Sequence, residues 1–200
     1  MVVRSPTLQN VALDLAAACR RLVAHRRYRA FLDFARSIIL RESDWLLTGL
    51  NAYRGVLRTV GIHKALWRRS RIPGAVLVDE GTVQSAHSVL VHVGQPARAH
   101  DIRAFRKLVP LPDLIIHVTA PIEVVLARTL ARRDPPMRHR NRDDNLRFVL
   151  HAHAMFDELM ADAAFPRERV TIHCRDDGWD QYRNHAAVVV ERIARASAAA

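Results

Sequence analysis

Hydrophobic residues in the first 70 positions recur at spacings of three and four. This spacing predicts amphipathic helices, whose other faces are filled largely by arginine. After residue 74 the pattern changes, and short apolar runs rich in β-branched residues predict buried strands at 75–79, 114–119 and 170–174. Further helices are expected at about 82–93, 99–108, 122–133, 143–163 and 179–196. Strands joined by helical crossovers predict a helix-rich α/β protein with a parallel sheet and helices on both faces.

The same pattern predicts which large side chains are buried. Phe31, Trp45 and Trp67 stand at core positions of the helical pattern. His117 and His173 lie inside predicted strands and are interpreted as core histidines with satisfied hydrogen bonds.

The length of 200 residues fits one domain, with a basic helical part at 1–71 and an α/β part at 72–200. Residues 1–71 hold 14 basic and 4 acidic side chains, and thus carry +10 of the chain's net charge of +11. Such a block favours nucleic acid, an anionic membrane surface or a phosphorylated ligand as a partner, although a solvated arginine-rich face explains it equally well.

Little in the sequence points to secretion or to a membrane. Cys19 and Cys174 are too few for a disulfide framework, and the first residues lack the apolar core of a signal peptide. The longest stretch without Asp, Glu, Lys or Arg, at 81–97, contains glutamine and histidine. We therefore expect no membrane span and a cytoplasmic location.

The first candidate site is Asp79-Glu80-Gly81, at the carboxyl end of the strand expected at 75–79. Open parallel sheets bind ligands beyond the carboxyl ends of their strands. Asp79 could hold Mg²⁺ directly or through water, Glu80 could orient a hydroxyl, and Gly81 would allow close approach. Gln84 could hydrogen-bond an acceptor base. A helix-capping aspartate is the simpler alternative.

The second candidate site is a group of arginines after the strand expected at 114–119. Arg128 and Arg132 are four apart, which would place them on one helical face. Guanidinium groups bind phosphoryl oxygens bidentately, so these arginines and a loop closing over them predict a polyanion site rather than only a solvated face. The group is completed by Arg133, Arg138, Arg140 and Arg142.

In their order and spacing, these segments resemble the carboxyl-terminal two thirds of P-loop nucleoside and nucleotide kinases of the thymidylate/adenylate kinase-like group. Residues 75–81 resemble the third strand with its acidic end, and 112–118 resemble the fourth. Residues 121–133 are similar to the helix that leads into the lid, which would be 134–142. Residues 170–178 resemble the last strand and the loop beside the adenine.

The resemblance implies a three-layer sandwich that binds ATP and Mg²⁺ and transfers phosphate to a small-molecule acceptor. Asp79 would hold the metal, with Glu80 and Gln84 facing the acceptor, which would also contact the helices of residues 1–70. Charge on the transferred phosphoryl group would be neutralised by Arg132, Arg138 and Arg140. The nucleotide would be contacted by Gly81, Arg128, Arg132, Arg175 and Asp177.

The sequence departs from this family at its defining motif. No G-x-x-x-x-G-K-[ST] loop is present, and the only lysines are Lys64 and Lys107. That loop supplies the backbone amides and the lysine that hold the phosphates. The chain therefore looks like an N-terminally truncated kinase, expected to bind ATP weakly, to be inactive alone, and to expose an apolar gap between the strands at 75–79 and 114–119.

Three explanations for the missing loop stay open: a fragment or misassigned start, a partner that supplies the strand, or a rearranged fold without catalysis. Two other functions also stay open. Sulfuryl transfer fits the fold but does not call for the acidic pair. A non-catalytic basic module would bind nucleic acid or an anionic partner through residues 1–71, although no known nucleic-acid motif is present.

Overall fold

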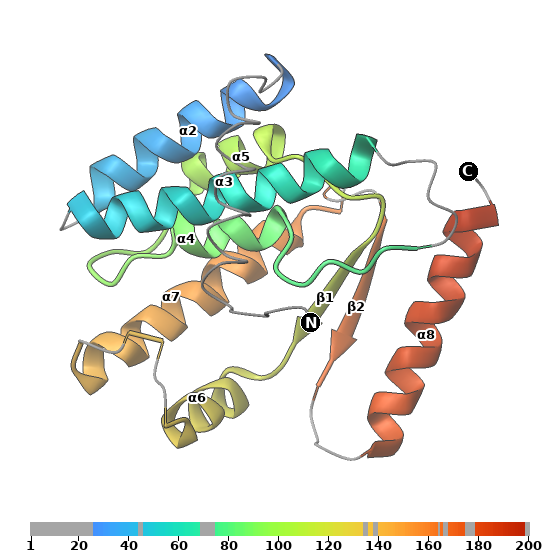
Figure 1. The fold of residues 1–200 in the computed structure, drawn as a ribbon. Coiled ribbons are helices and arrows are strands. Elements are labelled where there is room, and N and C mark those ends of the chain that lie inside the picture. The colour runs from blue at the N-terminus through green and yellow to red at the C-terminus, as the bar shows by residue number, and fades with distance from the viewer. Residues whose placement is uncertain are drawn as a thin grey trace, which may run out of the picture. The chain divides into compact units, whose positions relative to one another are not determined.

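The computed structural model describes residues 26–43, 46–68, 75–133, 136–137, 140–163, 165, 168–174 and 179–198. Its helices and strands are labelled in Figure 1. The described residues form two compact units. The first holds 26–68, 78–90 and 104–111, and the second holds 75–77, 91–103 and everything from 112 onward. The part expected at 72–200 is thus shared between the two units.

The first unit is helical. It contains α2 (Arg26–Glu42), α3 (Leu46–Arg68), the 3₁₀ turn η1 (Val83–Ser85), α4 (Ala86–Leu90) and the second half of α5 (Ala99–Leu108). Its core is built around Phe31 and Phe105, which are fully buried and meet edge to face with ring centroids 5.6 Å apart. Aliphatic residues of α2, α3 and α4 complete the core: Ala35, Ile38, Ile39, Val56, Val60, Val89 and Leu90.

The second unit contains a parallel pair of strands, β1 (Ile115–Thr119) and β2 (Arg169–His173). The register runs from Ile115 opposite Arg169 to Thr119 opposite His173. Two helices, α6 (Ile122–Ala131) and α7 (Arg142–Ala161), join the strands, and α8 (Trp179–Ala198) follows β2. A parallel pair requires such a long crossover connection, because a short turn can join only antiparallel strands.

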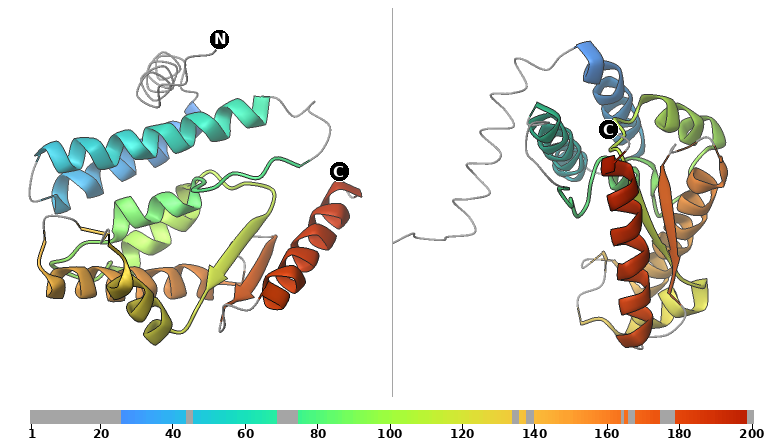
Figure 2. Two further views of the ribbon diagram at one scale, coloured as in Figure 1. Left: turned by 60° about the horizontal axis from the view of Figure 1, so that its bottom comes forward. Right: turned by 90° about the vertical axis from the view of Figure 1, so that its right-hand side faces the viewer.

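The two faces of this small sheet are covered differently. One face carries Ile116, Val170 and Ile172, and Val189 of α8 packs against it. The other face lies toward α7, as the right-hand view of Figure 2 shows. Because side chains alternate along a strand, one face is apolar and the other takes residues 117, 119, 169, 171 and 173. Helices on both faces of a parallel sheet are therefore confirmed for this unit.

The strands at 115–119 and 169–173 and helices α5 to α8 begin and end within two residues of the predicted bounds. The buried strand predicted at 75–79 is wrong. Residues 75–78 have no regular secondary structure, and Val76, Leu77 and Val78 are 53%, 79% and 38% exposed. A strand exists only as a partner in a ladder, and within the described residues β1 pairs only with β2.

Two further predictions need correction. Trp67 is not a core residue, since it is 48% exposed and stacks on His63. Phe31 is buried as predicted. Trp45 lies outside the described residues. The helix expected at 82–93 is shorter than predicted. The 3₁₀ turn η1 leads directly into α4, and α4 ends at Leu90. The β-branched Val91 and Val93 and then Gly94 follow, and these residues favour a helix less than unbranched residues do.

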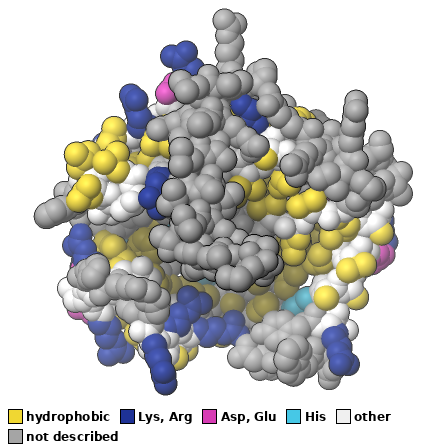
Figure 3. Space-filling view, in the orientation of Figure 1, with side chains coloured by type: hydrophobic (Ala, Val, Ile, Leu, Met, Phe, Trp, Pro, Cys, Tyr) yellow, Lys and Arg dark blue, Asp and Glu magenta, His cyan; other side chains and the backbone are white. Residues whose placement is uncertain are grey.

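The first unit also exposes apolar side chains. In Figure 3, hydrophobic side chains gather over the ends of α2 and α3 that are joined to each other. The exposed leucines there are Leu40, Leu46, Leu47 and Leu50. Among the described helices, none combines the length and the hydrophobicity that crossing a membrane requires.

Candidate functional site

The predicted acidic site lies in a turn of the first unit. Asp79 and Glu80 are exposed, and Glu80 has a φ of 54°, the only positive φ of a non-glycine residue in the described chain. Left-handed backbone costs a side chain such as glutamate about 1–2 kcal/mol. Gly81, where such a conformation would have been easy, does not adopt it, and a Cβ atom there would meet open space. Gln84 is exposed in η1, one turn further on.

Buried hydrogen bonds hold the end of this turn. The hydroxyl of Thr82 donates to the carbonyl of Pro110, and the hydroxyl of Ser85 donates to the Thr82 carbonyl at 2.5 Å. His87 lies close behind the turn, where burial lowers its pKa while the Glu80 carboxylate opposes that shift. The relation between Glu80 and His87 was not predicted, because Glu80 lies in a turn before the helix and no helical spacing connects the two residues.

Asp79 and Glu80 fit a weakly held Mg²⁺ ion. No ion pair with either carboxylate is seen within the described residues, and no group of three or more metal-ligating side chains exists among them. Magnesium is usually held by one or two carboxylates, with waters and substrate phosphates completing its shell. The acidic turn could therefore hold the ion through water, but it does not form a closed metal site.

The arginine-bearing helix of the second unit is α6, directly after β1. The carbonyl of Pro121 accepts hydrogen bonds from the amides of Val124 and Val125 and so begins the helix. The helix ends at Ala131, and Arg132 has extended backbone with ψ of 138°. The prediction that Arg128 and Arg132 share a helical face is therefore wrong. Arg128 is half-buried on the helix, whereas Arg132 is exposed beyond its end.

The loop that was predicted as a lid is fastened to α7 by one buried side chain. The amide nitrogen of Asn145 donates to the carbonyls of Met137, Arg140 and Asn141, and its oxygen accepts from the amide of Met137 at 2.9 Å. Asn141 in turn caps α7 by accepting from the amide of Asp144 at 2.8 Å. Arg140 is thus exposed on an anchored segment. Asn145 was not predicted as a site residue.

The predicted site residues do not all belong to one described unit. Arg138, Arg175 and Asp177 lie outside the described residues. The acidic turn belongs to the first unit and the described arginines belong to the second, so their convergence around one cleft stays a prediction. Neither lysine follows a strand: Lys64 is buried within α3, and Lys107 is the second-last residue of α5. The helical positions of both lysines agree with the absence of a phosphate-binding loop in the sequence, since such a loop carries its lysine directly after a strand.

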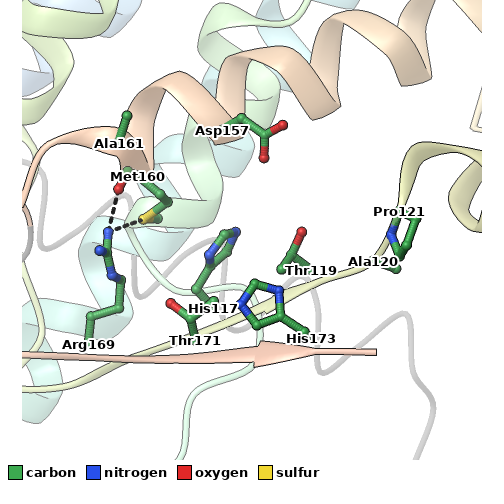
Figure 4. Close-up of a pocket in the computed structure, with 10 residues that line it drawn as sticks. All are labelled: His117, Thr119, Ala120, Pro121, Asp157, Met160, Ala161, Arg169, Thr171 and His173. Carbon is green, nitrogen blue, oxygen red and sulfur yellow. Dashed lines mark hydrogen bonds between the residues drawn. The ribbon is translucent and has the colours of Figure 1, made fainter. Parts of the chain in front are cut away.

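An open cleft of about 440 Å³ lies in the second unit between α7 and the polar face of the sheet (Figure 4). Its floor consists of alternate residues of the two strands: His117, Thr119, Thr171 and His173. The interpretation of the two histidines as core residues is wrong, since His173 is exposed and His117 is only half-buried. The other lining residues are Ala120, Pro121, Asp157, Met160, Ala161 and Arg169.

Charged groups at the edges of this cleft already have partners within the protein. The Arg169 guanidinium donates to the carbonyls of Met160 at 2.6 Å and Phe165 at 3.3 Å. On α7, Nδ1 of His153 lies 2.9 Å from the Asp157 carboxylate, and Nε2 lies 3.1 Å from the carbonyl of Ala120. These contacts tie α7 to both strands and fix the width of the cleft.

His117 is the titratable group of the cleft with a perturbed environment. Burial lowers its pKa, and the nearby Arg169 charge adds to this effect. Asp157 opposes the shift, while His173 and His153 contribute further small decreases. The imidazole of His117 is therefore neutral at pH 7, with one nitrogen that donates and one that accepts.

The chain matched no protein-family model, no curated protein and no solved structure.

Proposed function

We propose that this chain binds a phosphorylated nucleotide in the manner of the P-loop kinases that its sequence resembles. The observation that carries the proposal is the concentration of arginine immediately after a parallel strand. Figure 3 shows basic side chains over α6 and the start of α7. The described arginines of this segment are Arg128, Arg132, Arg133, Arg140, Arg142 and Arg147.

The anchored loop supports this proposal. Binding a polyphosphate requires several cations held at fixed places, because every side chain that must be ordered on binding reduces the affinity. Asn145 fixes the backbone at Arg140 before any ligand arrives. By the family resemblance, Arg132 and Arg138 would then neutralise phosphoryl charge together with Arg140.

The proposed roles of the other residues follow from the family resemblance. Bound ATP with Mg²⁺ would supply the phosphoryl group, with Asp79 holding the metal through water. Glu80 and Gln84 would face a small-molecule acceptor. We expect these 200 residues to bind the nucleotide weakly and to transfer phosphate poorly, because no lysine-bearing phosphate loop is present.

Isothermal titration with Mg-ATP tests the proposal, using a double variant of Arg128→Ala and Arg132→Ala. Each lost charge-assisted contact should weaken binding roughly tenfold. The control is Arg183→Ala on α8, which removes an exposed arginine of the same unit and should leave the affinity unchanged. Equal losses in both proteins would show that only the net charge attracts the nucleotide.

A second candidate function rests on α3. This helix carries Arg54, Arg58, Lys64 and Arg68 and no acidic residue. Arg54 and Arg58 are exposed one turn apart, a spacing that suits the phosphates of a nucleic acid. Two results would favour this function. Binding of a fluorescent oligonucleotide should fall steeply between about 50 and 200 mM salt, and it should be lost in a variant that combines Arg54→Ala and Arg58→Ala.

A further inference from the structure

The cleft floor of the second unit has an unusual composition for a sheet face beneath a helix. In the register of the two strands, His117 stands opposite Thr171, and Thr119 stands opposite His173. The two imidazoles therefore lie on one diagonal of the floor, and the two hydroxyls lie on the other. The opposite face of the same strands is apolar: Val170 and Ile172 are buried there, and only Val118 at its edge is exposed. The polar residues of the floor are therefore confined to one face of the sheet.

The four floor side chains have no hydrogen-bond partner among the residues that the structure describes. In contrast, the charged groups at the cleft's edges are bound to carbonyls or to each other, as Arg169 and the His153–Asp157 pair show. Polar groups that converge on a cleft without internal partners are available to a ligand. The four side chains offer hydrogen-bond donors and acceptors. His117, whose pKa is lowered by burial, adds no charge at pH 7.

The shape and the remaining walls limit the class of ligand. Figure 4 shows His117 and His173 rising from the strands toward Asp157 on α7, with Thr119 beside His173 and Pro121 at one end. Met160, Ala161 and Ala120 add apolar surface. Imidazole rings stack on planar heterocycles, and hydroxyls hydrogen-bond to ring edges. A volume of about 440 Å³ lies in the range of small-molecule sites.

We propose that this cleft binds an uncharged heteroaromatic ring with hydrogen-bonding edges, namely the base of a nucleoside. The base would lie against His117 and His173, and its edge would meet Thr119 and Thr171. The proposal deepens the proposed function and rests on it for the choice of a nucleoside over other planar heterocycles. The base site is separate from the arginines of α6, so each can be removed without the other.

The test is titration of the whole chain with adenosine and uridine, which carry no phosphate, followed by NMR or calorimetry. We expect saturable binding of at least one nucleoside. A double variant of Thr171→Val and His173→Ala changes two exposed side chains and should weaken that binding at least tenfold, since each lost hydrogen bond or stacking contact contributes several-fold. Far-ultraviolet circular dichroism establishes that the variant is folded.

Two controls separate this proposal from the proposed function. Val188→Ala, at an exposed position of α8 in the same unit, should leave nucleoside binding unchanged. The double variant at Arg128 and Arg132 should also leave it unchanged while it weakens Mg-ATP binding. No saturable binding of either nucleoside to the unmodified chain, or binding that survives the cleft variant, would overturn the base site. If the double variant at Arg128 and Arg132 loses Mg-ATP binding but still binds the nucleoside, the base site is supported as separate from the arginines.

Discussion

Asn145 and Met137 exchange two hydrogen bonds: the Met137 amide donates to the Asn145 side-chain oxygen at 2.9 Å, and the Asn145 side-chain nitrogen donates to the Met137 carbonyl at 3.2 Å. A side-chain amide presents a donor and an acceptor side by side, so it can pair with one residue's backbone as a strand would. Asn145 is 6% exposed. The pair therefore fastens the arginine-bearing loop to the start of α7 at Met137.

Replacing Asn145 with alanine should lower the free energy of unfolding by about 1–3 kcal/mol, because it removes the hydrogen bonds that hold the loop backbone at Met137 and Asn141. Asn145→Asp should destabilise at least as much, since a carboxylate would face the carbonyls that the amide nitrogen now serves. Urea denaturation measures both effects. Asn184→Ala, at an exposed position of α8, is the control. Full stability of Asn145→Ala would show that the loop does not depend on this side chain.

The aromatic pair Phe31 and Phe105 should dominate the stability of the first unit. Both rings are completely buried, so Phe105→Ala should cost about 3–5 kcal/mol. A double-mutant cycle with leucine at both positions should give a coupling of about 0.5–1.5 kcal/mol for the edge-to-face contact. In the same unit, Leu40→Ala changes a side chain that is 52% exposed and should cost less than about 0.5 kcal/mol. A coupling near zero would mean that the rings act only through their burial.

His117 should make the second unit sensitive to acid. Its pKa is lowered below 6.5 in the folded chain, so the unfolded chain binds more protons once the pH falls below that value. Stability is therefore unaffected above about pH 7 and decreases as the pH falls through 6.5 toward the lowered pKa. The slope due to one such group is at most about 1.4 kcal/mol per pH unit.

His117→Gln should remove this contribution. Unfolding by urea at a series of pH values should give a shallower decrease below pH 6.5 for the variant than for the unmodified chain. The difference between the two proteins at pH 8, where both are neutral at this position, gives the effect of the substitution on packing alone. Parallel curves over the whole range would contradict the assignment of acid sensitivity to His117.

The acidic turn allows a test that separates backbone strain from charge. Glu80→Gly should stabilise the chain by up to about 1 kcal/mol, because glycine adopts a positive φ without the steric cost of a side chain. The same change should lower the pKa of His87 further, since the carboxylate that opposes the effect of burial is lost. An NMR titration of the His87 ring measures that shift. An unchanged His87 pKa would show that Glu80 does not act on the imidazole.

Gly81→Ala offers a complementary measurement at the next position. A Cβ atom there meets open space, so the fold should tolerate alanine within about 1 kcal/mol. If the acidic turn approaches a metal-bound phosphate, the added methyl group should weaken Mg-ATP binding while thermal unfolding stays unchanged. Unaltered nucleotide affinity would remove Gly81 from the proposed site.

The sequence pattern predicted strand β2 of the second unit correctly, but it predicted wrongly a strand at 75–79 before the acidic turn. Val170 and Ile172 alternate with polar residues and are buried, so β2 could be read from its own sequence. The segment at 75–78 has an equally apolar composition but lacks a ladder, and a neighbouring strand is not a local property. The bonds of Asn145 could not be predicted either, because the loop returns to it across eight residues with no repeating pattern.

The exposed segment at 75–78 also affects how the protein behaves at high concentration. Val76, Leu77 and Val78 form a short run of high β-propensity with little cover and no charge, which is the composition of segments that pair between molecules. Pro73 precedes this run, and Asp79 and Glu80 follow it directly. Proline cannot donate to a ladder, and stacked carboxylates repel one another, so these residues oppose intermolecular pairing. We therefore expect the two carboxylates that are proposed to hold a magnesium ion also to oppose self-association. Neutralising both should shorten the lag time of aggregation.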